Sequence, residues 1–183
     1  MIKRWILACA AMVLGVYVYG QSLHAEKIDI PGTGLTNLYR IDEGVYRSEQ
    51  PSATDFAALE RYGIREVLNL RNYHSDDDEA AGTSLILHRL RTKAGKISEE
   101  DLLEALRIIK NRKGPILIHC WHGSDRTGAV IAMYRIVFQG ATKADAIREL
   151  TEGGFGYHKI YSNIPRTIEQ ADIARIKQEL GLP

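Results

Sequence analysis

A short apolar run of strand length is followed, after one turn, by a segment that is apolar nearly all round. The run is residues 115–119, Pro-Ile-Leu-Ile-His, and the later segment is residues 129–138. A strand without polar alternation is typical of one that is buried on both faces of a sheet. A helix without a polar face must be buried as well. Both elements are therefore expected at the centre of the domain.

The rest of the chain alternates strands with helices. Further strands are expected over 45–48, 65–70 and 84–90, and further helices over 53–62, 98–114, 142–152 and from Pro165 to about residue 180. Residues 26–39 are expected to be an extended lead-in. This alternation predicts an α/β fold with a mostly parallel central sheet of four to five strands flanked by helices. Ligands of such sheets bind at the carboxyl ends of the strands.

Two polar stretches are expected in loops. Residues 72–82 contain Asp76, Asp77 and Asp78 in a row, and residues 91–96 are basic. A run of acids is more often a solvated surface than a site, so we expect the three aspartates to face water.

The first 25 residues are set apart from the domain that follows. Lys3 and Arg4 precede an apolar run over residues 5–19, and a short polar segment then ends at Ala25. This is the layout of a secretory signal, so we expect cleavage after Ala25 and one domain over 26–183. The alternative is an uncleaved membrane anchor, although the apolar run is shorter than the roughly 20 residues that a span needs. Both interpretations predict an exported domain.

Charge and cysteine content narrow the function. The chain has 24 basic and 23 acidic side chains, and cleavage would remove Lys3, Arg4 and Cys9. A nearly neutral domain is not expected to bind nucleic acid or a membrane surface through bulk charge. The remaining cysteine, Cys120, is either a buried structural residue or a chemical group at risk of oxidation in an exported protein. Its neighbours favour the second interpretation.

Cys120 stands at the carboxyl end of the apolar strand, just before a helix. The loop from Trp121 to Arg126 would aim successive backbone N–H groups at one point above the helix terminus, which makes a cradle for an anion. Gly123 permits the curl of the backbone, and Gly128 lets the helix pack closely. Arg126 adds a planar fork for two phosphate oxygens. The same positive field favours the ionised thiol, so we expect a thiolate that attacks phosphorus.

Residues 119–128, HCWHGSDRTG, contain the pattern H-C-x-x-G-x-x-R-T-G. This pattern matches the signature loop of the cysteine-dependent protein tyrosine phosphatase superfamily. Further similar stretches are residues 46–48 with Pro51, 114–120, 132–137 with 139–140, and 153–156. Together they resemble the exported dual-specificity tyrosine phosphatases of Gram-negative bacteria, which are related to plant and fungal atypical dual-specificity phosphatases. The resemblance implies their fold, a phosphocysteine intermediate on Cys120, a periplasmic location and no cofactor.

The resemblance also implies roles for single residues. Cys120 would be the nucleophile, Arg126 the clamp on the phosphate oxygens, and Thr127 a hydroxyl donor to the thiolate, while His119 would shape the loop through hydrogen bonds. The residues expected to bind phosphate are Trp121, His122, Gly123, Ser124, Asp125 and Arg126. A metal role for His119 and His122 would need further ligands, and no ligand spacing is recognisable in the sequence, so no metal is expected.

One part of the family pattern is missing. These enzymes usually protonate the leaving oxygen with an aspartate on a loop that here falls within residues 92–96, near Gly95, and this stretch has no carboxylate. General acid catalysis is worth roughly 10²- to 10⁴-fold, so another acid is expected. The candidate is Asp125, because an aspartate in this place is implicated in acid catalysis in myotubularins and some bacterial phosphatases with phosphoinositide activity. A solvated or loop-bracing Asp125 is equally consistent with the sequence, and the other carboxylates considered are Glu99, Glu100, Asp101 and Asp76 to Asp78.

Three functions follow from these residues. The first is hydrolysis of phosphotyrosine in proteins, with phosphoserine and phosphothreonine as further substrates. The second is hydrolysis of inositol polyphosphates, for which basic walls would come from Arg91, Lys93, Lys96, His122 and His158, although Asp125 would repel a polyanion. The third, a phosphate-binding pseudophosphatase, rests on the missing aspartate alone, and the presence of both Cys120 and Arg126 argues against it. A membrane would be a partner only through an uncleaved signal segment.

Overall fold

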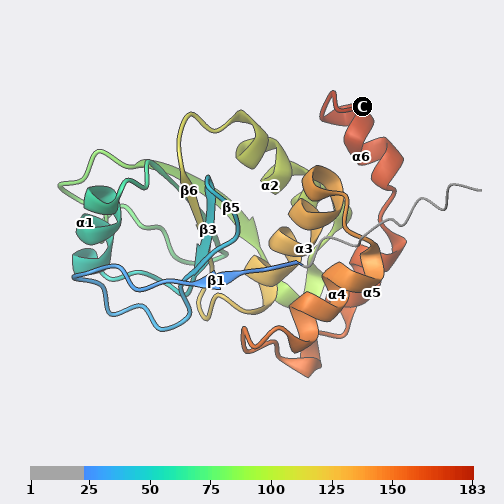
Figure 1. Cartoon of the computed structure of the whole chain (residues 1–183), viewed down its shortest axis with the longest axis horizontal. Helices are drawn as coiled ribbons and strands as arrows, with labels where there is room; N and C mark the ends of the chain where they lie inside the picture. The colour runs from blue at the N-terminus through green and yellow to red at the C-terminus, as the bar shows by residue number, and fades with distance from the viewer. Residues whose placement is uncertain (1–22) are drawn as a thin grey trace, which may run out of the picture.

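The structure is a computed structural model that describes residues 23–183, so the predicted signal segment lies outside the described residues except for its last three. A six-stranded sheet runs through the domain in the order β1-β2-β3-β6-β4-β5 (Figure 1). The pairs among β3, β6, β4 and β5 are parallel, and β1 and β2 add an antiparallel edge. The strands are β1 (Glu26–Lys27), β2 (Tyr39–Arg40), β3 (Val45–Ser48), β4 (Glu66–Arg71), β5 (Ile86–Thr92) and β6 (Ile116–His119).

The predicted α/β class and mostly parallel sheet are confirmed, while the predicted number of strands was too low. The additional strands, β1 and β2, have two residues each and lie in the segment expected to be an extended lead-in. Such short pairings leave little periodicity in a sequence, because side-chain alternation needs several residues to become visible.

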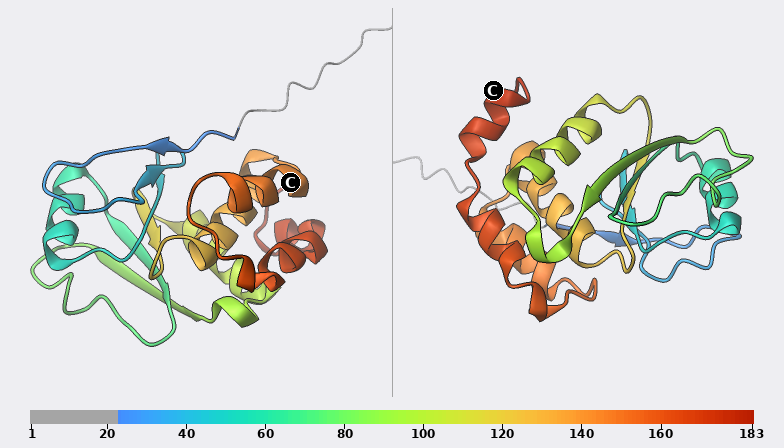
Figure 2. Two further views of the ribbon diagram at one scale, coloured as in Figure 1. Left: turned by 90° about the horizontal axis from the view of Figure 1, so that it is seen from below. Right: turned by 180° about the vertical axis from the view of Figure 1, so that it is seen from behind.

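Helices cover both faces of the sheet, as Figures 1 and 2 show. Helix α1 packs on one face, and helices α2 to α6 cover the other. Residues of β6 alternate between the two cores, since Leu117 lies in the cluster that contains Phe56 of α1, whereas Ile116 and Ile118 lie in the cluster with α2 and α3. The helices are α1 (Ala53–Tyr62), α2 (Glu99–Asn111), α3 (Asp125–Gln139), α4 (Lys143–Glu152), α5 (Asn163–Gln170) and α6 (Ile173–Glu179), with 3₁₀ turns η1 (Ala94–Lys96) and η2 (Lys159–Tyr161).

Helix α3 is the central helix, as its apolar sequence predicts. It packs against α2, α4, α5, α6 and β6. A Cβ atom added to Gly128 would lie 2.4 Å from Cδ1 of Leu150 in α4, so the close packing expected at this glycine is confirmed. The helix begins at Asp125, four residues before the predicted apolar segment, because the polar residues of the signature pattern form its first turn.

Two other predicted boundaries were wrong. The basic stretch 91–96 is the end of β5 followed by η1. The last predicted helix is divided into α5 and α6, because Asp172 caps a new helix by accepting a hydrogen bond from the backbone N–H of Arg175 at 3.0 Å.

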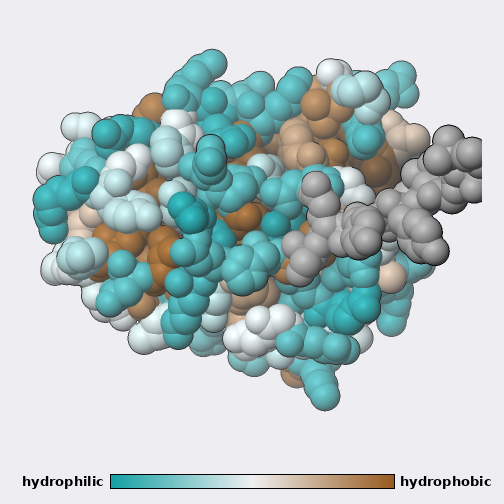
Figure 3. All heavy atoms as spheres, in the orientation of Figure 1, coloured by the Kyte–Doolittle hydropathy of each residue, from teal (hydrophilic) through white to brown (hydrophobic). Residues whose placement is uncertain are grey.

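The surface is mixed in character. Apolar side chains reach the face shown in Figure 3 only in separate patches between polar ones. Within residues 23–183, every helix is too short or too polar to traverse a lipid bilayer.

Candidate active site

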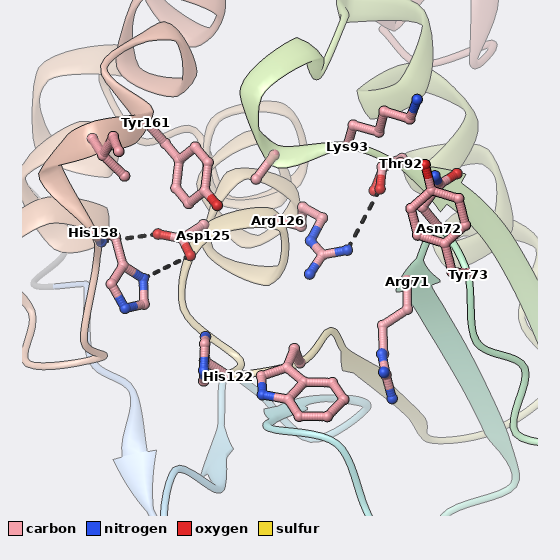
Figure 4. A pocket seen from close by; sticks show the side chains of 13 residues that line it. Arg71, Asn72, Tyr73, Thr92, Lys93, His122, Asp125, Arg126, His158 and Tyr161 are labelled. Carbon is pink, nitrogen blue, oxygen red and sulfur yellow. Dashed lines mark hydrogen bonds and ion pairs between the residues drawn. The ribbon is translucent and has the colours of Figure 1, made fainter.

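The signature loop, defined here as residues 120–126, connects β6 to α3 at the carboxyl end of the parallel strands. Cys120 follows β6 directly and is 2% exposed. A pocket of about 530 Å³ opens beside the loop (Figure 4). Its walls come from the ends of β4 and β5, from the signature loop and from the η2 segment. Among the residues that line it are Arg71, Lys93, His122, Asp125, Arg126 and His158.

The carbonyl groups of the signature loop are held from behind. Trp121 O accepts from the backbone N–H of Gln50 at 3.1 Å, His122 O from the side chain of Asn37 at 2.8 Å, and Gly123 O from Arg47 at 2.7 Å. In a trans peptide the N–H points opposite to the C=O, so the N–H groups of the next three residues face away from these partners. Among the described residues, these N–H groups donate no hydrogen bond to the protein. These free N–H groups are what the predicted anion cradle requires, and binding of an anion there stays a prediction.

Arg47 contacts the signature loop and was missed by sequence reasoning. It lies in β3, is 1% exposed, and its guanidinium stands 3.9 Å from the ring centroid of Phe155. Burial lowers the pKa of Arg47 to about 10, so the side chain remains charged at neutral pH. A fully buried cation directly behind the loop fixes Gly123 and adds positive potential to the cradle. The available signal was a charged residue inside the short strand expected over 45–48.

Gly123 is required by both conformation and space. Its φ is 71°, in the left-handed region, and a Cβ atom would lie 2.5 Å from the carbonyl carbon and oxygen of Ser48. The curl expected at this glycine is therefore confirmed. Ser124, the next residue, donates its hydroxyl to Phe155 O at 2.7 Å and ties the loop to the segment after α4.

His119 and Asp76 form a buried pair behind Cys120. His119 Nε2 lies 2.8 Å from Asp76 Oδ2, and His119 Nδ1 lies 3.3 Å from Cys120 O. Gln50 Nε2 donates to the other Asp76 oxygen at 2.9 Å. Asp76 is only 4% exposed, so the prediction that the whole acid run faces water was wrong at this residue. Burial opposes ionisation, but the hydrogen bonds from His119 and Gln50 outweigh it and lower the pKa of Asp76.

Arg126 and Thr127 lie in the first turn of α3. Arg126 points into the pocket (Figure 4), where Nη1 contacts the carbonyls of Leu70 at 3.3 Å and Thr92 at 3.5 Å. Its Nε, and the hydroxyl of Thr127, are buried without a hydrogen-bond partner among the described residues. Buried polar groups without a partner are rare in folded proteins, and a reacting group bound in the pocket would account for these two.

Asp125 contacts His158, at the start of the η2 segment, on one side of the pocket (Figure 4). Its Oδ1 accepts from the backbone N–H of His158 at 2.9 Å, and its Oδ2 lies 2.9 Å from His158 Nδ1. Asp125 is 5% exposed, so it is not a solvated surface residue, and it is the single carboxylate among the described residues that line the pocket. Residues 92–94, near the place of the missing family aspartate, do line the pocket, as expected.

The other carboxylates considered from the sequence are occupied elsewhere. Asp101 belongs to the capping box of α2 with Ser98. Glu99 and Glu100 pair with Arg175 of α6. Of the predicted basic wall residues, Lys93, His122 and His158 line the pocket, and Lys96 and Arg91 do not.

The mouth of the pocket carries exposed apolar side chains. Trp121 is 54% exposed, Tyr73 89% and Ile160 83%. Arg71 stacks on Trp121, with its guanidinium carbon 4.2 Å from the ring centroid, and donates to Gln50 at 2.8 Å. Burial and the nearby charge of Arg126 both lower the pKa of Arg71.

Two groups of side chains have the composition of a metal site. His122, Asp125 and His158 each offer one ligand atom, all within 4.8 Å of one another, and the same holds for His74, Asp76 and Glu79. The first group joins the signature loop and α3 to His158, which lies 33 residues beyond Asp125, whereas the second lies within the single segment 74–79. In both groups the aspartate already accepts hydrogen bonds from protein donors.

A family model described as "Polymorphic toxin system, DSP-PTPase phosphatase" matches residues 42–141, which include β3, the whole signature loop and α3. The chain belongs to this DSP-PTPase family and is a cysteine-based phosphatase. The sequence-based placement in the protein tyrosine phosphatase superfamily is thereby confirmed.

Individual relatives agree with this placement. The dual specificity protein phosphatase TpbA of Pseudomonas aeruginosa, strain UCBPP-PA14, is 34% identical over 181 residues, which cover 92% of this chain and 82% of TpbA. A crystal structure of a variant of P. aeruginosa TpbA in complex with pTyr has a TM-score of 0.76 at 30% identity, covering 88% of this chain and 98% of that one. The core catalytic domain of the PP-IP phosphatase SIW14 from S. cerevisiae has a TM-score of 0.66 at 28% identity, covering 80% of this chain and 94% of that one.

Proposed function

We propose that the protein hydrolyses phosphotyrosine in exported proteins, with phosphoserine and phosphothreonine as slower substrates. The observation that carries this proposal is the apolar mouth of the pocket. Of the five large apolar side chains that are exposed in the described chain, three lie there, namely Tyr73, Trp121 and Ile160. Exposed aromatic side chains around a binding site are typical of surfaces that pack against peptide side chains.

The chemistry assigned to the site has two steps. The Cys120 thiolate attacks phosphorus and forms a phosphocysteine, and water then releases phosphate. Arg126 and the N–H groups of the signature loop hold the three oxygens that carry the charge in both transition states. Thr127 donates its hydroxyl to sulfur when the thiolate is regenerated. The unpartnered Thr127 hydroxyl and the inward direction of Arg126 support these assignments.

Inositol polyphosphates are the second candidate substrates. Arg71, Lys93, His122 and His158 stand around Arg126, and this basic lining suits a polyanion. The likeness to a PP-IP phosphatase supports the same candidate. Asp125 and the apolar mouth favour a phosphopeptide, because neither interacts favourably with a highly charged small molecule.

A substrate panel tests the proposal. The full chain is assayed with p-nitrophenyl phosphate, a phosphotyrosine peptide, a phosphoserine peptide and inositol hexakisphosphate, and kcat/KM is expected to be highest for the phosphotyrosine peptide. A higher value for the inositol phosphate would reject it in favour of the second candidate. Cys120→Ser is the control: turnover should be lost, while phosphate binding measured by calorimetry is retained because the N–H cradle is unchanged.

We also propose that residues 1–25 direct export to the periplasm and are removed. Strand β1 begins at Glu26, directly after the expected cleavage site, so the cleaved domain would keep every strand of the sheet. Edman sequencing of the chain recovered from a periplasmic extract should begin at Glu26. An intact N-terminus in the membrane fraction would support the anchored alternative, and recovery from the cytoplasm would reject export.

A further inference from the structure

We propose that His158 is the proton donor to the leaving group and that Asp125 is the residue that positions it. This inference rests on the proposed phosphatase activity and concerns the step for which the usual family aspartate is absent. It changes the role that the sequence suggested for Asp125, from the acid itself to the partner of the acid.

The carboxylate of Asp125 is fully engaged by His158. Both of its carboxylate oxygens accept hydrogen bonds from the same residue, one from the backbone N–H and one from the ring of His158, each at 2.9 Å. An ionised carboxylate is an acceptor only, and both of its oxygens here are already engaged by His158. Asp125 is therefore poorly arranged to give a proton to substrate. It is well arranged to hold His158 in one orientation.

Asp125 and His158 differ in how far their side chains are exposed. The side chain of Asp125 is 8% exposed and that of His158 is 46% exposed, with the imidazole lining the pocket. Nδ1 faces Asp125, and Nε2 makes no hydrogen bond to any described residue. Figure 4 shows this second nitrogen on the side of the ring turned away from Asp125. A pocket-lining histidine with one nitrogen fixed by a carboxylate and the other without a protein partner has the arrangement of a general acid and base.

Charged and aromatic groups surround His158. Asp125 faces it from α3, His122 from the signature loop with its ring centroid at 5.2 Å, and Tyr161 from η2 at 6.4 Å. Tyr157 and Lys159 flank it in the chain, and Arg126 lies across the pocket. Asp125 provides the one negative charge among these groups until a phosphate dianion binds. Substrate binding then adds more negative charge beside the imidazole.

The proposed proton movements balance over the two steps. As the sulfur–phosphorus bond forms, the bond from phosphorus to the ester oxygen breaks, and that oxygen takes the Nε2 proton and leaves as an alcohol or phenol. His158 is then neutral. In the second step it accepts a proton from the attacking water, while the sulfur–phosphorus bond breaks and the thiolate is restored. His158 ends as it began, protonated.

The test is the dependence of kcat/KM on the leaving group in His158→Gln, measured in the full chain with EDTA present. A phosphoserine peptide and phenyl phosphate, which need a proton, should be hydrolysed roughly 100-fold more slowly than by wild type. p-Nitrophenyl phosphate should lose less than about fivefold, because its leaving group is stable as an anion. Equal losses for all three substrates would overturn the proposal.

Two matched variants separate this role from a general effect of the pocket wall. His122→Gln removes a histidine from the same wall and leaves the hydrogen bonds between Asp125 and His158 in place. Its kcat/KM should fall by the same factor for all three substrates. Tyr161→Phe removes the hydroxyl of a tyrosine that lines the same pocket, and a leaving-group-selective loss in that variant would assign the proton to the tyrosine instead.

Asp125→Asn tests the positioning role. Removing the acceptor that orients the imidazole should slow phenyl phosphate more than p-nitrophenyl phosphate, in the same direction as His158→Gln but less strongly. Equal losses for both substrates would contradict the pairing. If EDTA alone abolished the wild-type rate and Zn²⁺ restored it, the cluster with His122 would be a metal site and the proposal would fall. Wild type inactive on p-nitrophenyl phosphate with and without metal would reject the proposed phosphatase function itself.

Discussion

Two aspartate–histidine pairs lie in the same site and differ mainly in what surrounds them. The distances are nearly equal, 2.8 Å in His119–Asp76 and 2.9 Å in His158–Asp125. In the first pair the side chains are 0% and 2% exposed, and both ring nitrogens have protein partners. In the second, the histidine is nearly half exposed and lines the pocket, and one ring nitrogen has no hydrogen-bond partner among the described residues.

We call the buried pair His119–Asp76, together with the signature loop that it supports, the back of the site. We call the exposed pair His158–Asp125 and the mouth of the pocket its front. A proton on the buried pair has no route to substrate, so His119 and Asp76 act on the reaction only by holding Cys120 and its loop. A proton on His158 exchanges with water and with bound substrate. Changes behind the loop should therefore slow every substrate and lower stability, while changes in front should discriminate between substrates and leave stability nearly unchanged.

Gly123→Ala should have the largest effect, because the loop would have to move away from Ser48. A displacement of about 1 Å at a reacting group costs roughly 100-fold, so kcat/KM should fall by at least that factor for aryl and alkyl phosphates alike. Strain at a positive φ adds a loss of about 1 kcal/mol in the free energy of unfolding, measured by urea denaturation.

Gly82→Ala is the matched control for this variant. Gly82 has a similar φ of 85°, and an added Cβ would meet nothing within 4 Å. Gly82→Ala should therefore lower the free energy of unfolding through backbone strain but leave kcat/KM unchanged. Normal rates in Gly123→Ala, or a loss for alkyl substrates alone, would contradict the claim that changes at the back of the site slow all substrates alike.

Asp76→Asn should have the next largest effect, mainly on stability. The variant weakens a buried, charge-assisted hydrogen bond, and the free energy of unfolding at pH 7 should fall by about 1–3 kcal/mol. Rates should fall by a similar factor for all substrates, in contrast to His158→Gln. Asp77→Asn, an exposed neighbour in the same acid run, is the control and should change neither quantity.

The pH dependence of this loss has a definite sign. The pKa of Asp76 is lowered in the folded protein, so its contribution to stability is fully present above the unfolded value of about 3.9 and is lost as pH falls through the folded value. The difference between wild type and Asp76→Asn, measured by urea denaturation, should therefore shrink below about pH 4. A difference that grew with acidity would contradict the assignment.

The sequence was sufficient for the parts of the site that are local in the chain. Strand β6, the signature loop and α3 are consecutive, and their burial, curl and anion-binding character follow from apolar runs, Gly123 and Arg126. The partners of this loop are distant in sequence. His158 lies 33 residues from Asp125, and Asp76 lies 43 residues from His119, so neither pair leaves a spacing that can be read from one chain.

Asp76 and Asp77 show the limit most clearly. They are adjacent aspartates in one acid run, and only the fold distinguishes them, since one is buried under His119 and the other faces water. Charge patterning describes the average behaviour of such a run. The position of each side chain relative to a buried histidine depends on how β4 and the following loop pack beside β6, which single-sequence reasoning does not determine.

Trp121→Ala should have the smallest effect and belongs to the front of the site. Loss of the exposed indole and its stacking with Arg71 should raise KM for a phosphotyrosine peptide roughly threefold to tenfold, because such contacts contribute about 0.5–1.5 kcal/mol. KM for p-nitrophenyl phosphate should change less, and the free energy of unfolding should stay within about 0.5 kcal/mol of wild type. Tyr62→Ala, an exposed aromatic side chain away from the pocket, is the control and should leave both KM values unchanged. If Trp121→Ala weakened both substrates equally, the indole would be supporting the signature loop instead of contacting the peptide, and it would belong with Asp76 to the back of the site.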